Sequence, residues 1–208
     1  MIRLALPKGR NLKIALDAFR AAGVGLADVD VGDRRLRVEL PEDGLEILFL
    51  KDWDLPVYVE YGIADCGVLG SDVLEEVGAD LLVPARFKEG RCRLSLIGAG
   101  NELPRPGRQI RLASKYPQTA RRILEDRSWS AEVIKLSGSV ELAPLLSLAE
   151  LALDIVQTGR TLKENNLQEL EIVREIAPCL VVNRAAYQTH RTELNRLLDR
   201  FEDAGTVD

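Results

Sequence analysis

The sequence is poor in histidine, the side chain that most often carries metal ions and acid–base catalysis. It contains one histidine in 208 residues. His190 lies in a polar stretch at the start of an expected C-terminal helix, and we interpret it as a solvated helix residue. A single histidine argues against His-rich metal sites, HExxH zinc proteases and most Ser-His-Asp schemes. We therefore expect chemistry that runs without an imidazole, and we assign no residue as a metal ligand.

Cysteine and long hydrophobic runs are also scarce. Cys66, Cys92 and Cys179 are odd in number and widely spaced, which fits neither a disulfide framework nor a zinc knuckle, so buried structural thiols are expected. Residues 1–8 lack the apolar core and cleavage site of a signal peptide, and no later segment approaches about eighteen uninterrupted apolar residues. We therefore expect a cytoplasmic protein.

An excess of positive charge is absent as well. The chain has 28 lysines and arginines against 33 acidic residues, a net charge of −5, which argues against a nucleic-acid surface. The G-x-x-x-x-G-K-[ST] loop of P-loop proteins is missing, and Gly98-Ala99-Gly100 lacks the third glycine of the dinucleotide fingerprint. Nucleic-acid binding, P-loop phosphate binding and NAD binding lose their main support.

What the sequence does have is an alternation of strand-like and helix-like segments. A strand beginning at Ile2 is followed by a glycine turn and a helix that stops near Gly23. Further strands are expected at 35–40, 46–50, 64–70, 91–97, 110–113, 132–136 and 179–182, and further helices at 55–61, 72–77, 119–125, 140–148 and 187–201. This alternation predicts an α/β protein with mainly parallel sheets and helices on both faces.

The segments fall into two sets, which predicts two lobes. We expect a first lobe of residues 1–88 plus 182–208 and a second lobe of residues 89–181. No linker-like stretch separates them, which favours a hinge of two crossing strands. A cleft between two such lobes is where a ligand is expected.

The most informative segment is Thr158-Gly159-Arg160-Thr161, which lies between an apolar run at 151–157 and a helix-like stretch at 162–166. A strand that stops at Thr-Gly and restarts as a helix aims backbone N–H groups and two hydroxyls at one point, which favours phosphate. Asp154, just upstream, suits sugar hydroxyls or a phosphate-bound magnesium ion. Together they indicate a phosphorylated ribose, although a glycine after a strand is also an ordinary turn residue.

Three other strand-to-helix turns carry polar residues. Lys8-Gly9-Arg10 places two cations at a helix start, and Arg34 with Arg35 adds a second cationic pair. Gly70-Ser71-Asp72 and the segment 137–141, which ends in Glu141, offer glycine, hydroxyl and carboxylate groups. Solvent exposure of the cations and helix capping by the other two turns are the competing interpretations.

Four blocks of this sequence, taken in order, resemble the successive blocks of ATP phosphoribosyltransferase over nearly the whole chain. They are Pro7-Lys8-Gly9-Arg10, the segment 54–72 that ends in Gly-Val-Leu-Gly-Ser-Asp, the segment 138–145 that reads Gly-Ser-Val-Glu-Leu-Ala-Pro-Leu, and the segment 154–162 that reads Asp-Ile-Val-Gln-Thr-Gly-Arg-Thr-Leu. The resemblance implies a fold like that of type II periplasmic binding proteins. It also implies the first step of histidine biosynthesis, in which phosphoribosyl pyrophosphate and ATP give N1-(5-phosphoribosyl)-ATP and pyrophosphate.

The same resemblance implies residue roles. Arg10 and Arg34 match arginines associated with the departing pyrophosphate. The residues implied for phosphoribosyl pyrophosphate are Glu141, Asp154, Thr158, Gly159, Arg160, Thr161 and Leu162, and those for ATP are Lys8, Gly9, Lys51, Gly70, Ser71 and Asp72. Lys51 stands where the family often has arginine, which weakens a bidentate contact there.

The resemblance further implies Mg²⁺ that is bound together with phosphoribosyl pyrophosphate. Because the sequence stops at Asp208 without a histidine-binding domain, it resembles the short form of the family. That form implies a homodimer that assembles with a regulatory subunit similar to histidyl-tRNA synthetase.

Two alternatives stay open at this point. A cytoplasmic two-lobed module that binds a small anion explains the lobes but not the loop at 158–161. A nucleobase-salvage phosphoribosyltransferase generally carries two adjacent acidic residues in its loop, whereas Asp154 has no acidic neighbour.

Overall fold

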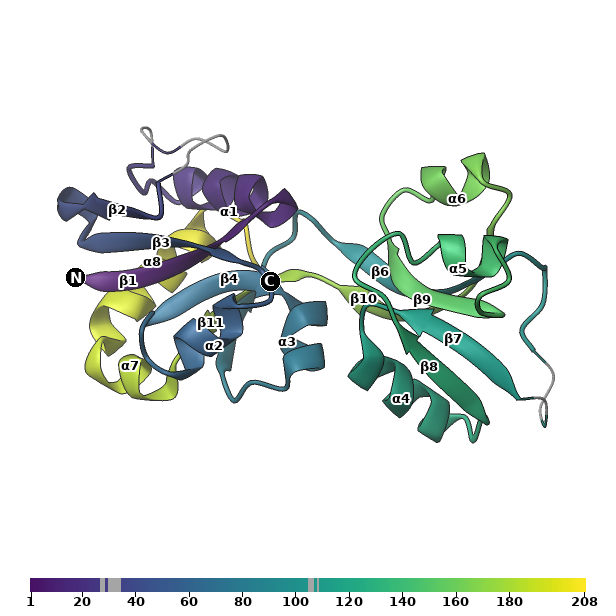
Figure 1. Cartoon of the computed structure of the whole chain (residues 1–208). Coiled ribbons are helices and arrows are strands. Elements are labelled where there is room, and N and C mark those ends of the chain that lie inside the picture. Colours follow the sequence, from purple (N-terminus) through teal and green to yellow (C-terminus); the bar gives the residue numbers. More distant parts are fainter. Residues whose placement is uncertain (27–28, 30–34, 105–106, 108) are drawn as a thin grey trace. The chain divides into compact units, whose positions relative to one another are not determined.

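The chain folds into two compact units, each built around its own β-sheet (Figure 1). The structure, a computed structural model, describes residues 1–26, 29, 35–104, 107 and 109–208. Unit 1 comprises Met1–Arg91 with Ala177–Asp208, and unit 2 comprises Cys92–Ile176. The expected division between residues 181 and 182 is displaced, because it would cut through a strand that pairs wholly within the first sheet.

Unit 1 holds a six-stranded sheet. Its elements are β1 (Ile2–Lys8), α1 (Arg10–Ala21), β2 (Arg37–Leu40), η1 (Pro41–Asp43), β3 (Leu45–Lys51), α2 (Leu55–Glu60), β4 (Cys66–Gly70), α3 (Ser71–Val77), β5 (Leu82–Arg86), β11 (Pro178–Val182), α7 (Arg184–Thr189) and α8 (Arg191–Asp203). The strand order is β2-β3-β1-β4-β11-β5. Strands β3, β1 and β4 form a parallel core, while β2 and β11 run against their neighbours.

Helices cover both faces of this sheet. Successive side chains of a strand point to opposite faces, so a central strand such as β1 contributes apolar residues to two cores. On β1, Leu4 and Leu6 join the core formed with α1 and α8, whereas Ala5 joins a second core formed with α2 and α3. Phe19 of α1 packs edge-on against Phe201 of α8, with ring centroids 4.8 Å apart. The expectation of helices on both faces is thereby confirmed.

Unit 2 holds a five-stranded sheet in the order β10-β6-β9-β7-β8. Its elements are β6 (Cys92–Gly98), β7 (Ile110–Ser114), α4 (Pro117–Asp126), β8 (Ala131–Lys135), α5 (Leu142–Leu145), β9 (Leu151–Val156), α6 (Arg160–Glu164) and β10 (Gln168–Ile176). Strands β9, β7 and β8 are parallel, and β6 runs against both of its neighbours. Helices α5 and α6 lie on one face of the sheet, and α4 packs on β7 and β8 from the other (Figure 1).

Some expected elements differ from those observed. The helix expected at 140–148 is reduced to α5, because Ser139 and Ser147 have positive φ angles of 47° and 58° and break the helix on both sides. The expected final helix is two helices, α7 and α8, that meet at His190. Strands β5 and β10 were not expected from the sequence.

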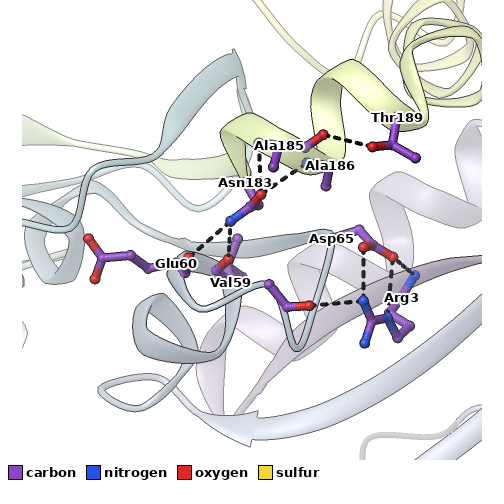
Figure 2. A network of polar contacts seen from close by, with 9 residues as sticks. Arg3, Val59, Glu60, Asp65, Asn183, Ala185, Ala186 and Thr189 are labelled. Carbon is purple, nitrogen blue, oxygen red and sulfur yellow. Dashed lines mark hydrogen bonds and ion pairs between the residues drawn. The ribbon is translucent and has the colours of Figure 1, made fainter.

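An ion pair between Arg3 and Asp65 links the N-terminal ends of β1 and β4, two central strands of the unit 1 sheet (Figure 2). The Arg3 N–H donates to Asp65 Oδ2 at 2.7 Å, and its Nη2 donates to Asp65 Oδ1 at 3.2 Å and to the Gly62 carbonyl at 2.9 Å. Asp65 lies just before β4, so this pair ties β4 to β1. The opposite, C-terminal ends of the parallel strands are the ends where α/β proteins bind ligands.

Asn183 joins two helices of the same unit (Figure 2). Its Oδ1 accepts from the N–H groups of Ala185 and Ala186 at 2.9 and 3.0 Å, which caps α7. Its Nδ2 donates to the carbonyls of Val59 and Glu60 at the end of α2. One side chain therefore supplies acceptors and donors that two helix ends lack.

The cysteines agree with the expectation of buried structural thiols. All three cysteines are buried thiols, and burial raises the pKa of Cys66 and Cys179. Within the part of the chain that the structure describes, no helix is both long and apolar enough to cross a membrane.

Candidate functional site

The turn between β9 and α6 has the geometry expected of a phosphate loop. Gly159 has a φ of 72°, a left-handed conformation that strains any residue with a side chain, and it is the N-terminal cap of α6. The Arg160 N–H donates to Thr158 Oγ1 at 3.4 Å. Leu162 is buried in the core beneath α5 and α6 and anchors the turn. The first-turn N–H groups of a helix have no intrahelical acceptors, so they are available to an anion.

A cavity of about 280 Å³ opens beside this turn within unit 2. Its lining residues are Ile97, Glu141, Asp154, Ile155, Val156, Gln157, Thr158, Gly159, Arg160, Thr161 and Leu162. The structure therefore brings together all of the residues that the sequence assigned to phosphoribosyl pyrophosphate. Ile97 of β6 was missed, because strand β6 is distant in sequence and its pairing with β9 is a property of the fold.

Two kinds of polar group line the cavity. Asp154 and Glu141 are half-buried and contribute carboxylates, and Asp154 Oδ1 accepts from the Ile155 N–H at 2.8 Å. Thr158 and Thr161 contribute hydroxyls from the exposed turn. Carboxylates accept hydrogen bonds from sugar hydroxyls, whereas backbone N–H groups and hydroxyls donate to phosphate. The lining therefore suits a molecule that carries both hydroxyl groups and a phosphate.

Arg160 faces solvent within this lining. Its Nε donates to Glu164 at 2.7 Å, and its side chain is 82% exposed. Because such an exposed pair is weak, the guanidinium is able to exchange Glu164 for an incoming phosphate oxygen.

Ser114, a buried residue that sequence analysis missed, supports the strand that carries Asp154. Its Oγ donates to the Leu153 carbonyl at 2.8 Å and accepts from the Tyr116 N–H at 2.9 Å. The hydroxyl thereby joins the C-terminal end of β7 to the middle of β9, one residue before Asp154. A serine at the end of an apolar strand was the only sequence signal available for it.

The two acidic residues of the cavity do not form a protein metal cage. Among the described residues, no group of three or more His, Cys, Asp or Glu side chains is arranged to hold a metal ion. Magnesium commonly binds through one or two carboxylates together with substrate phosphates and water. Glu141 and Asp154, which line the same cavity, are carboxylates of the type that would hold such an ion.

In unit 1, the lysines assigned to ATP lie side by side. Lys8 and Lys51 are register partners at the C-terminal ends of the parallel strands β1 and β3, and both are exposed. Gly9, with a φ of 112°, turns the chain from β1 into α1. Two adjacent ammonium groups at this end of the sheet make a local cationic site on an acidic protein.

The turn at Gly70 brings the second set of residues assigned to ATP to the same end of the sheet. A Cβ on Gly70 would lie 2.1 Å from Asp72 Oδ1, so Gly70 lets the Asp72 carboxylate fold back on the turn. Ser71 donates its N–H to the Ala177 carbonyl at 2.9 Å, and its Oγ accepts from the Ala177 N–H at 3.2 Å. Ser71 and Asp72 are both buried, and Gly70 rather than Ser71 is the cap residue of α3.

The two arginines assigned to catalysis are not placed. The backbone of Arg10 begins α1, but its side chain lies outside what the structure describes. Arg34 also lies outside the described residues.

Comparison with known proteins gives one consistent family. A family model described as "HisG: ATP phosphoribosyltransferase" matches residues 51–203. ATP phosphoribosyltransferase of Syntrophotalea carbinolica is 40% identical over 205 residues, which cover 97% of this chain and 94% of that protein. The Thermus thermophilus enzyme of the same name is 41% identical over 202 residues, with 97% and 96% covered. A solved structure described as the ATP phosphoribosyl transferase (HisG:HisZ) complex from Thermotoga maritima superimposes with a TM-score of 0.84 at 34% identity, covering 98% of this chain and 97% of that one.

Proposed function

This chain belongs to the ATP phosphoribosyltransferase family, and we propose that the cavity beside β9 is where it binds phosphoribosyl pyrophosphate. The family reaction is a step of histidine biosynthesis that joins the phosphoribosyl group to N1 of the adenine of ATP and releases pyrophosphate. The observation that carries the proposal is that a phosphate-type turn and two carboxylates line one cavity of unit 2.

The roles within the cavity follow from the chemistry of the groups. The backbone N–H groups and hydroxyls at Thr158, Gly159 and Thr161 bind the 5-phosphate, and Leu162 anchors their turn. Asp154 and Glu141 accept hydrogen bonds from ribose hydroxyls and orient the sugar ring. Because these contacts are made by a strand end and a helix start, the anomeric carbon is held at a fixed position.

Neither the nucleophile nor the leaving group needs a histidine. N1 of adenine is a neutral ring nitrogen with an in-plane lone pair, so its attack needs little help from a general base. Negative charge grows on the departing pyrophosphate, and we assign its neutralisation to Arg10 and Arg34. The magnesium ion that accompanies phosphoribosyl pyrophosphate supplies further positive charge when bound.

For ATP we propose the C-terminal edge of the unit 1 sheet. Lys8 and Lys51 supply adjacent ammonium groups for the triphosphate, and Gly9 gives the nucleotide access to the backbone. Gly70, Ser71 and Asp72 act through the shape of the β4–α3 turn, since the Ser71 hydroxyl is engaged by Ala177.

The Thermotoga structure is described as a complex of two proteins. By analogy, we propose that this chain forms a homodimer and assembles with a regulatory subunit similar to histidyl-tRNA synthetase. The enzyme is favoured over a module that only binds a small anion, because relatives of about the same length carry the enzyme name.

The test is an assay of the purified full chain with ATP, phosphoribosyl pyrophosphate and Mg²⁺, with and without a HisZ partner. The expected result is a product with the mass of phosphoribosyl-ATP and an equal amount of pyrophosphate. Binding of phosphoribosyl pyrophosphate without product under both conditions would instead support the binding module.

A further inference from the structure

An arginine outside the cavity lining connects the phosphate turn to the sheet. Arg93, in β6, donates through Nη1 to the carbonyl of Gln157 at 3.3 Å, and Gln157 immediately precedes Thr158. The same guanidinium donates through Nε and Nη2 to the two carboxylate oxygens of Glu169 in β10, the second at 2.7 Å. One planar group therefore holds a side chain of β10 and the backbone of the turn at once.

Glu169, the residue that holds Arg93, is itself held by a second hydrogen bond. Ser95, which is fully buried in β6, donates from Oγ to Glu169 Oε1 at 2.7 Å. The Arg93 and Glu169 side chains are only 27% and 22% exposed. Hydrogen bonding between them raises the pKa of Arg93 and lowers the pKa of Glu169, so both are charged at neutral pH.

The position of Arg93 explains why it reaches the turn. Arg93 is the register partner of Val156, the last residue of β9, so the guanidinium lies where the chain leaves the sheet. A Cβ built on Gly159 would lie 4.0 Å from Arg93 Nη2, so the guanidinium lies beside the left-handed glycine. Helix α6 has five residues and mostly exposed side chains, so it contributes little rigidity of its own.

We propose that Arg93 is a positioning residue for phosphoribosyl pyrophosphate: held by Glu169, it fixes the Gln157 carbonyl and keeps the turn at 158–161 in the conformation that receives the 5-phosphate. This inference rests on the proposed function of that turn. A preorganised loop binds its ligand more tightly because less conformational freedom is lost on binding. Arg93 itself makes no contact with the substrate in this account.

The first test measures binding of phosphoribosyl pyrophosphate with Mg²⁺, and of ATP, to the full chain by titration calorimetry. Arg93→Ala and Arg93→Lys should each raise the Kd for phosphoribosyl pyrophosphate by about tenfold, because neither retains the planar fork. The Kd for ATP should stay unchanged within error. Unaltered binding of phosphoribosyl pyrophosphate by both variants would overturn the proposal.

Arg127→Ala is the matched control. Arg127 donates to both carboxylate oxygens of Glu171, through Nη1 at 2.9 Å, so it forms the same kind of pair with the same strand. Its guanidinium is engaged by Glu171 and not by the turn at 158–161. This variant should lose similar thermal stability and keep its affinity for phosphoribosyl pyrophosphate. An equal loss of affinity in Arg127→Ala would assign the effect to general destabilisation of unit 2 and contradict a positioning role.

Glu169→Gln separates positioning from direct contact. If Arg93 acts by holding the turn, weakening its anchor should raise the Kd for phosphoribosyl pyrophosphate as Arg93→Ala does. If Arg93 binds the phosphate itself, release from Glu169 should leave the affinity unchanged or increase it, and the proposal fails.

Thr161→Ala distinguishes this inference from the proposed function. Weaker binding in Thr161→Ala with normal binding in the Arg93 variants would reject only the positioning role. Normal binding in Thr161→Ala would reject the assignment of the turn itself.

Discussion

Arg111 and Glu150 exchange backbone and side-chain hydrogen bonds at the N-terminal ends of β7 and β9. The Arg111 N–H donates to Glu150 Oε2 at 2.6 Å, Nη2 donates to Oε1 at 2.8 Å, and the Glu150 N–H donates back to the Arg111 carbonyl at 3.1 Å. Arg3 and Asp65 make the same set of contacts between β1 and β4. In both units an ion pair links the N-terminal ends of two strands. The residues that we propose to bind substrate lie at the opposite, C-terminal ends.

This relationship predicts an acid-sensitive contribution to the stability of unit 2. Hydrogen bonds from Arg111 lower the pKa of Glu150 from 4.5 to about 2. A carboxyl group whose pKa is lower in the folded state than in the unfolded state stabilises the folded protein, and this contribution is complete above the unfolded-state pKa. For Glu150 the contribution is lost as the pH falls from about 4.5 to about 2. Glu150→Gln should lower the unfolding temperature at pH 7 by about 3–5 °C, and the difference from the parent should shrink below pH 4.

Glu164→Gln serves as the comparison for that experiment. Glu164 also pairs with an arginine of unit 2, but the two side chains are 58% and 82% exposed. Calorimetric scans should show almost no change for this variant at any pH. A Glu150→Gln protein as stable as its parent at pH 7 would refute the fastening role.

Gly159 provides a second prediction, because its φ of 72° strains any side chain regardless of space. Gly159→Ala should raise the KM for phosphoribosyl pyrophosphate by about tenfold and cost about 1 kcal/mol of stability. Gly100→Ala is the control, since Gly100 has an ordinary φ and open space around it. Steady-state kinetics that show equal effects for the two variants would argue against the conformation assigned to the turn.

Thr161 lines the cavity from the first turn of α6. Thr161→Ala removes one hydroxyl donor to the 5-phosphate and should raise the KM for phosphoribosyl pyrophosphate by about tenfold. The KM for ATP in the same assay is the internal control and should stay constant. An unchanged requirement for phosphoribosyl pyrophosphate would count against this contact.

Arg10 is predicted to act on the leaving group rather than on ATP binding. Its charge meets negative charge that grows in the transition state, so Arg10→Ala should slow single-turnover product formation by on the order of 100-fold. The Kd for ATP should change little. A variant with normal single-turnover chemistry would contradict the role.

The features that the sequence predicted depend on local chemistry. Gly159 was identified because it stands between a clear apolar run and a helix-like stretch, where the chain must turn. Helices on both sheet faces followed from the alternation of strands and helices, and α1 buries Leu12, Leu16 and Phe19 in the core.

The features that the sequence did not predict depend on pairing between distant segments. Strand β10 has mostly exposed or half-buried residues, so its pattern gave no strand signal. Its pairing with β6 joins residues that are 70 to 84 positions apart in the sequence, from Gln168 with Gly98 to Ile176 with Cys92. The Arg93–Glu169 pair depends on that register. Likewise, helix capping was the competing interpretation for the Ser71 hydroxyl, whereas this hydroxyl accepts from the Ala177 N–H, 106 residues away.

The decisive measurement is a crystal structure of the full chain with phosphoribosyl pyrophosphate and Mg²⁺. We predict the 5-phosphate within hydrogen-bonding distance of backbone N–H groups between Thr158 and Leu162, with the ribose hydroxyls facing Asp154 and Glu141. A 5-phosphate bound elsewhere, with this turn making no contact to the substrate, would contradict it.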